Sequence, residues 1–158
     1  MPNTTRPYLI LANIKTALEA ITSPTAPQAV YLDDSQARDI AEEAGPFYIV
    51  VPGVETLANT LIRSTVTLLE FTWEVHVAAM CKGRVVATTA TYGADLASEM
   101  RQAIIAALLA DRTRGGYALN TKQTKSGFYP EEYQDWDASV GVTFEIQYRH
   151  RDNDSRSG

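Results

Sequence analysis

The sequence contains very few of the residues from which catalytic and metal sites are usually built. Of its 158 residues, one is cysteine and two are histidine. The single cysteine, Cys81, excludes an intrachain disulfide and a zinc cluster of several thiolates. The nine glycines show no spacing typical of a phosphate-binding loop or a dinucleotide fingerprint. The fold must therefore rest on a packed core without covalent staples, as in a cytosolic protein.

The chain offers one candidate pair for nucleophilic catalysis, His76 and Cys81, and both lie in a predicted strand or its turn. Their odd separation points them to opposite faces, roughly 16 Å apart at about 3.3 Å per residue, whereas a dyad needs hydrogen-bond contact. Three acids, Asp39, Glu42 and Glu43, have no histidine among them and are interpreted as a solvated helix face. We therefore expect no enzyme activity, no cofactor and no metal.

Long apolar runs and an excess of positive charge are also missing. The most apolar run, residues 103–110, is far shorter than the roughly 20 residues that span a membrane. Lys15 and Glu19 interrupt the only N-terminal stretch that could act as a signal peptide, which favours synthesis and use in a cytosol. With 14 basic and 19 acidic residues, the net charge of −5 gives no general attraction to nucleic acid or to an anionic membrane.

The spacing of apolar residues predicts two main helices, at 7–21 and 94–112, and a short one between Asp33 and Gly45. A period of two predicts strands at 29–32, 47–51, 65–80, 84–91 and 140–149. In the longest strand one face is apolar and the other polar. The expected fold is α+β, a mainly antiparallel sheet with two main helices packed on one face. Residues 1–150 form one domain, and residues 151–158, which have no apolar side chain, form a mobile tail.

Residues 112–137 are long for a connection and carry two opposed blocks of charge. Four bases come first (Arg112, Arg114, Lys122 and Lys125), and four acids follow (Glu131, Glu132, Asp135 and Asp137). Aromatic residues stand among them (Tyr117, Phe128, Tyr129, Tyr133 and Trp136). Three interpretations remain open. The segment can be a solvated hairpin whose charges pair internally, a head-to-tail contact between subunits of a ring, or a single-strand nucleic acid site. The neighbouring acids and the net charge oppose the third.

The order of these elements resembles the tail terminator (tail completion) proteins of long-tailed bacteriophages and related phage-tail-like particles. The resemblance spans nearly the whole chain, to Arg149. Its parts are the N-terminal amphipathic helix, the strand Phe47-Tyr48-Ile49-Val50-Val51, the strand Phe71-Thr72-Trp73-Glu74-Val75-His76-Val77, the helix at 95–108, and the strand Val142-Thr143-Phe144-Glu145-Ile146-Gln147-Tyr148-Arg149. The resemblance rests on the order of the elements and on the general character of their sequences, because the family has no invariant motif to match.

The resemblance implies a structural protein of the virion, made in the host cytoplasm and placed at the junction of tail and neck. Six copies would form a ring on the last ring of the tail tube, stop its growth and join the tail to the head. The implied partners are other copies, the major tail-tube protein and a head–tail connector, with DNA passing through unread and no membrane contact. The candidate interface residues are Arg112, Arg114, Lys122, Lys125, Tyr129, Glu131, Glu132, Tyr133, Asp135, Trp136 and Asp137.

Two alternatives to a terminator stay open. One is another neck component, a head-closure or head–tail joining protein. The other, from a different class, is a small cytosolic module that binds a ligand or a partner.

Overall fold

The computed structural model describes residues 5–23, 26–32, 46–81, 93–127 and 138–151. These residues form two helices, α1 (Arg6–Glu19) and α3 (Gly93–Ala110), and five strands. The strands are β1 (Ala29–Tyr31), β2 (Phe47–Arg63), β3 (Val66–Cys81), β4 (Asn120–Gly127) and β5 (Ala138–Arg151). They make one sheet in the order β1-β2-β3-β5-β4, in which only β1 and β2 run parallel. The predicted α+β fold is confirmed.

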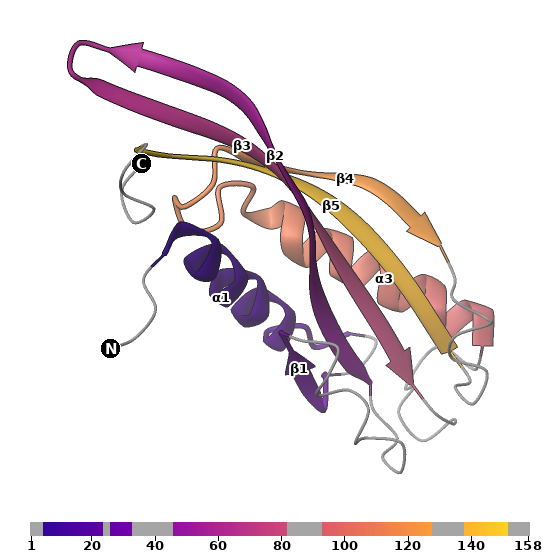
Figure 1. Ribbon diagram of the computed structural model, residues 1–158. Coiled ribbons are helices and arrows are strands. Elements are labelled where there is room, and N and C mark those ends of the chain that lie inside the picture. The colour runs from indigo at the N-terminus through magenta and orange to yellow at the C-terminus, as the bar shows by residue number, and fades with distance from the viewer. Residues whose placement is uncertain (1–4, 24–25, 33–45, 82–92, 128–137, 152–158) are drawn as a thin grey trace.

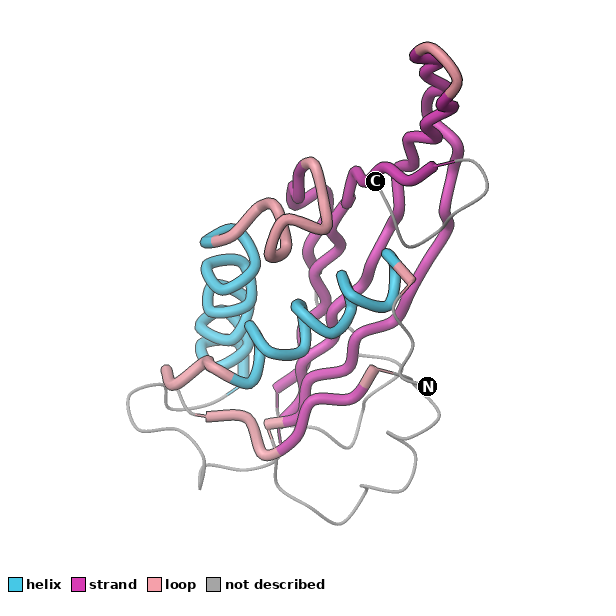
Figure 2. Tube along the Cα trace, turned by 90° about the vertical axis from the view of Figure 1, so that its left-hand side faces the viewer, coloured by secondary structure: helices cyan, strands magenta, loops and turns pink. Residues whose placement is uncertain are grey.

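Both helices pack on one face of the sheet, as predicted (Figure 2). The steps of three and four in the sequence place three residues of α1 and four of α3 in the core, all of them almost fully buried: Ile10, Ile14, Leu18, Leu96, Met100, Ile104 and Leu108. Alternate residues of β3 and β5 meet them from the sheet: Trp73, Val75, Val77, Val140, Val142, Phe144, Ile146 and Tyr148. Within the described residues, no helix is both long and apolar enough to cross a membrane.

The first long strand differs from the prediction, which closed it at Pro52-Gly53. Instead β2 continues to Arg63 and is 17 residues long. The pairing with β3 shifts register between Pro52 and Glu55, where a bulge accommodates the proline. A tight turn at Ser64, whose φ is +57°, leads into β3.

The far end of the β2–β3 hairpin projects beyond the helices and the rest of the sheet (Figure 1). The pairing of β5 with β3 ends at Leu68 and Arg151, so the hairpin from there to its turn has two strands among the residues that the structure describes. We call residues 54–67 the arm. Most of these residues are exposed to solvent.

The end of the chain also differs from the prediction. Residues 120–127, predicted as part of a connection, form the edge strand β4 against β5. Arg151, predicted to open the mobile tail, is the last residue of β5, and the ring of His150 stacks on Phe71 with 5.0 Å between centroids. The predicted helix after Asp33, the predicted strand at 84–91 and residues 152–158 lie outside the described residues.

Candidate functional site

Two long edges of the sheet have unpaired backbone groups in the part of the chain that the structure describes. β1 pairs only with Phe47, Tyr48 and Ile49, so the outer edge of β2 is uncovered from Val50 to Arg63. The other uncovered edge is the outer side of β4. Exposed N–H and C=O groups in a row are a template for pairing with another chain. Lys122 and Lys125 lie along β4, whereas no lysine lies along this part of β2. Lysines oppose such pairing on β4, and Pro52 and the two register shifts oppose it on part of β2, so both edges carry features that limit pairing.

The arm exposes large apolar side chains on the face of the sheet that carries the helices. Residues paired across antiparallel strands share a face, and Leu57 pairs with Phe71, which packs against the core. Ile62 pairs with Thr67 on the same face. Leu57 is 51% exposed and Ile62 is 76% exposed. The apolar face of the sheet therefore extends onto the arm, where no described residue packs over it.

The base of the arm is firmly held. The buried hydroxyl of Tyr148 on β5 hydrogen-bonds the Glu55 carboxylate, and burial, this bond and the charge of Glu55 together raise the pKa of Tyr148. On the opposite face, Arg149 Nη2 donates to Glu70 Oε2 over 2.7 Å. A two-stranded hairpin alone is marginally stable in water. These contacts fix the orientation of the arm at its base, whereas the described residues of its own chain add little stability to its tip.

The face of the sheet opposite the helices is polar. Lys122 Nζ lies 2.8 Å from Glu145 Oε1, and His76 Nε2 lies 3.0 Å from Glu74 Oε1. The other ring nitrogen of His76 is 3.0 Å from the hydroxyl of Thr143. Each carboxylate therefore has its own partner, although Glu74 and Glu145 are directly opposed in the sheet.

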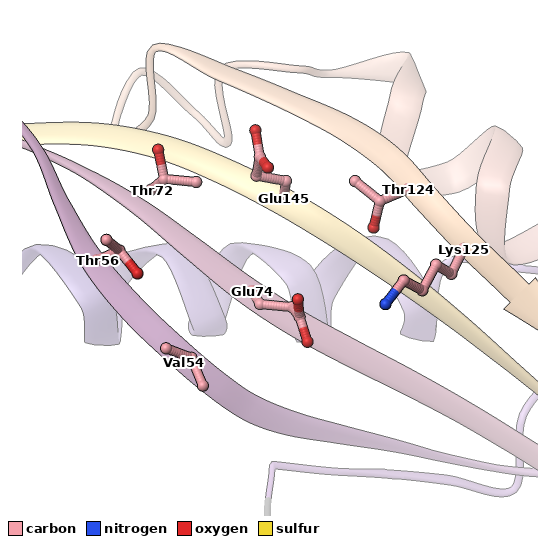
Figure 3. A pocket seen from close by; sticks show the side chains of 7 residues that line it. All are labelled: Val54, Thr56, Thr72, Glu74, Thr124, Lys125 and Glu145. Atoms are coloured by element: carbon pink, nitrogen blue, oxygen red, sulfur yellow. The ribbon is translucent and has the colours of Figure 1, made fainter.

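A shallow groove of about 340 Å³ crosses this polar face between β2 and β4 (Figure 3). It is lined by Val54, Thr56, Thr72, Glu74, Thr124, Lys125 and Glu145. The Lys125 side chain points from β4 toward β3. Among the described residues, no three histidine, cysteine or acidic side chains are grouped closely enough to hold a metal ion.

The expected separation of His76 from Cys81 is confirmed. His76 lies on the polar face, whereas Cys81 is fully buried in the core. The two side chains therefore do not form a nucleophilic dyad. The acids Asp39, Glu42 and Glu43 lie outside the described residues.

Arg114, predicted as an interface residue, is fully buried within its own chain. Its Nη2 donates to the Leu108 carbonyl, which closes the last turn of α3, and burial lowers the pKa of Arg114. The turn around it is held by Asp111, which accepts hydrogen bonds from the Thr113 hydroxyl and from the N–H of Gly115. These bonds lower the pKa of Asp111. Arg114 therefore has a structural role in the turn that follows α3.

The remaining predicted interface residues fall into two groups. Arg112 is exposed after α3, Lys122 is paired with Glu145, and Lys125 lines the groove on the polar face. The others lie outside the described residues: Tyr129, Glu131, Glu132, Tyr133, Asp135, Trp136 and Asp137. The structure thus brings Lys122 and Lys125 together on one strand.

Sequence reasoning missed the arm. Its apolar residues, Val54, Leu57, Leu61 and Ile62, do not alternate, because a second register shift falls between Leu57 and Asn59. A bulge inserts one residue and reverses the faces, which hides the period of two. The usable signal was the turn Ser64-Thr65 preceding the long strand.

A second groove lies on the outer surface of the helices, between the C-terminal end of α1 and the middle of α3. Its volume is about 430 Å³. The side chains that line it are mostly small: Ala17, Ala20, Ile21, Thr22, Ser23, Ala103, Ala106 and Ala107.

No protein-family model matches this chain, and no curated protein matches it in sequence.

Proposed function

We propose that this protein is the terminator of a bacteriophage tail, a structural protein that forms a ring on the end of the tail tube. The observation that carries the proposal is the arm, a preset hairpin on which Leu57 is 51% exposed and Ile62 is 76% exposed. Exposed apolar side chains on a projecting hairpin are suited to contact with another protein. The uncovered edge of β2 adds backbone groups suited to the same purpose.

The mechanism is interface complementarity rather than catalysis. Identical subunits close into a ring when each presents one surface to its neighbour and a different, complementary surface to the other neighbour. One face of the ring then imitates a tube subunit and binds the last ring of the tube. The opposite face offers no further site for tube addition and receives the neck instead. DNA passes without being held, because a chain of net charge −5 does not attract it.

The proposal is tested by removing the gene and examining the particles by negative-stain electron microscopy. We expect overlong or irregular tails lying apart from DNA-filled heads, because tube growth is not stopped and joining fails. Filled heads beside tails of normal length would move the protein to the head side of the neck. Normal, infectious particles would contradict both roles and favour a cytosolic binding module.

A charge reversal tests whether β4 contributes to assembly. Lys125→Glu changes an exposed lysine that makes no ion pair with the described residues, so we expect the monomer to stay folded. Lys122 is less suitable, because its reversal would place a third carboxylate beside Glu145 and Glu74. If β4 lies between subunits, ring formation measured by analytical ultracentrifugation falls in the variant. Lys125→Arg, which keeps the positive charge at the same position, is the matched control.

A further inference from the structure

We infer that the outer edge of β4 binds an extended acidic segment of a partner protein, which pairs with it as an additional strand of the sheet. This role of the edge goes beyond the proposed function and does not depend on it. Three features of the edge favour such a partner: its open backbone, the placement of its lysines and the charge of the segment that contains it.

The backbone of β4 is open on its outer side. β4 is the last strand of the sheet, and among the described residues only β5 pairs with it (Figure 1). Residues 122–126 are all exposed. The Thr121 hydroxyl donates to the Arg112 carbonyl over 2.9 Å. The Thr124 hydroxyl donates to the Thr143 carbonyl of β5 over 3.3 Å, so neither hydroxyl proton is left for the outer backbone carbonyls. A row of N–H and C=O groups therefore remains for a strand of another chain.

A β-bulge places both lysines of β4 on the polar face of the sheet. Lys122 and Lys125 are separated by an odd number of positions, which in a regular strand would point them to opposite faces. The register shift between Gln123 and Lys125 reverses the alternation between them. Since paired residues share a face, Lys122 lies with Glu145 and Lys125 lies with Thr143, both on the polar face. A strand added to β4 would therefore meet two cations on one face.

Both lysines lean inward, away from the outer edge. Lys122 Nζ lies 2.8 Å from Glu145 Oε1 on the neighbouring strand β5. The Lys125 side chain points over the sheet toward β3 (Figure 3), and it makes no ion pair with the described residues. The two side chains therefore leave room for a strand to approach, while their charges stay close to the edge. Edge lysines oppose a neutral or basic strand, but the same charges attract an acidic one, so they select the partner.

The charge of the surrounding segment also favours an acidic partner. Residues 112–127 contain four basic residues and no acidic one, although the net charge of the chain is −5. Arg114 is buried, which leaves Arg112, Lys122 and Lys125 exposed. Carboxylates at alternate positions of an added strand would lie on the same face as the two lysines, where opposite charges on neighbouring strands stabilise the pairing.

The acids of the polar face do not cancel this attraction. An added strand would lie about 5 Å outside β4 and about 10 Å from β5. The Debye length at physiological salt is about 8 Å, so the charges of Glu145 and Glu74 are screened at that distance. Glu145 and Lys122 also neutralise each other. Among the described residues, the nearest unpaired charge on the face is therefore that of Lys125.

A polypeptide fits the edge better than a nucleic acid does. Both would meet the lysines, but only a polypeptide supplies N–H and C=O groups at the spacing of a strand. β4 has no aromatic residue on which nucleic acid bases could stack. The shared contacts are thus electrostatic, and the backbone distinguishes the two partners.

Binding of a synthetic peptide to the full-length chain tests the inference. The probe is a peptide of the length of β4, with blocked ends, in which glutamate alternates with threonine, and binding is followed by the anisotropy of an attached dye. We expect saturable binding that weakens as the salt concentration is raised. One twin peptide has lysine in place of glutamate, and another has N-methyl groups on successive central amides, which removes the donors on both of its edges. Each twin should bind at least about tenfold more weakly.

Charge reversal on β4 locates the binding. Lys125→Glu removes one attraction and adds one repulsion, so we expect it to weaken binding of the acidic peptide roughly tenfold, whereas Lys125→Arg should bind like the wild type. Arg63→Glu makes the same change of net charge at an exposed residue of the arm and is the matched control. It should change the affinity less than about twofold, because exposed charges beyond a Debye length are screened. Urea midpoints of the three variants check that each stays folded.

Several results would overturn the inference. One is the absence of saturable binding by the acidic peptide. Another is equal binding of the N-methylated twin, which would mean that the backbone does not pair. Equal loss of affinity in Lys125→Glu and Arg63→Glu would place the site elsewhere. Displacement of the peptide by an oligothymidine that binds more tightly would assign the edge to a nucleic acid.

The outcomes also separate this inference from the proposed function. If the peptide binds as expected and the deletion particles are normal, the strand-binding edge stands and the role in the tail is wrong. If the peptide does not bind and the deletion gives overlong tails, the terminator function stands and the edge has no such partner.

Discussion

The arm and the core should respond very differently to the same substitution, isoleucine to alanine. Ile104 on α3 is 0% exposed, whereas Ile62 on the arm is 76% exposed. Deleting a buried isoleucine side chain removes its transfer free energy and leaves a cavity, at a cost of about 2 to 5 kcal/mol. We expect Ile104→Ala to lower the free energy of unfolding within that range.

The cost at Ile62 follows from the small part of its surface that the chain covers. Full burial of isoleucine is worth about 1.5 to 3 kcal/mol, so the hidden quarter contributes about 0.4 to 0.7 kcal/mol. The lower strand propensity of alanine adds at most about 1 kcal/mol. The total for Ile62→Ala stays below about 1.7 kcal/mol.

Urea unfolding followed by tryptophan fluorescence measures both costs, because Trp73 is buried in the core. The experiment is run at low protein concentration, where association contributes nothing to the free energy of unfolding. A cost above about 2 kcal/mol for Ile62→Ala would refute the reasoning, because it would mean that the arm packs within its own chain. A further cost that grows with protein concentration is expected only if Ile62 is buried between copies.

Three other predictions concern the fold that carries the arm. Asp111→Ala removes the acceptor that holds the turn after α3 and should cost about 1 kcal/mol at neutral pH. Because the fold lowers the pKa of Asp111, this contribution is present above the unfolded pKa and is lost as the pH falls through the folded pKa, so the wild type and the variant converge in acid urea titrations. Gly53→Ala would place a Cβ 2.9 Å from the Glu74 carbonyl oxygen and 2.9 Å from His76 Nε2, so thermal unfolding should show a loss of about 1 to 3 kcal/mol. Burial raises the pKa of Tyr48 to about 12. The wild type should therefore lose stability as the pH rises from the ordinary tyrosine value toward that pKa, and Tyr48→Phe should lose less, as measured by urea unfolding across that range.

Much of the sheet and both main helices could be predicted from the sequence, because each buries one regular apolar stripe. Ile10, Ile14 and Leu18 keep the helical period, and Val140 and Val142 keep the period of a strand, so local spacing was sufficient. β4 could not be predicted in the same way. Its sequence is polar almost throughout, and it is a strand because the edge of β5 supplies hydrogen bonds rather than because it buries an apolar face.

The candidate site was the least predictable part of the molecule. The charge pattern indicated a surface role for Arg114, and the sequence does not reveal that its guanidinium bonds the Leu108 carbonyl within its own chain. The arm escaped notice because Pro52 and Gly53 are normal signals of a strand end. Here the bulge lets an edge strand continue through them, and only the pairing with β3 shows it.

Tail length is the most direct test of the central claim that this chain ends tail growth through contacts of its arm. The gene deletion is complemented with the wild-type gene, with Ile62→Asp or with Ile62→Val, which keeps a branched apolar side chain, and tail lengths are measured by negative-stain electron microscopy. We expect uniform tails with the wild type and with Ile62→Val, and a broad distribution of long tails with Ile62→Asp and without complementation. Uniform tails of normal length joined to filled heads in the uncomplemented deletion would contradict it.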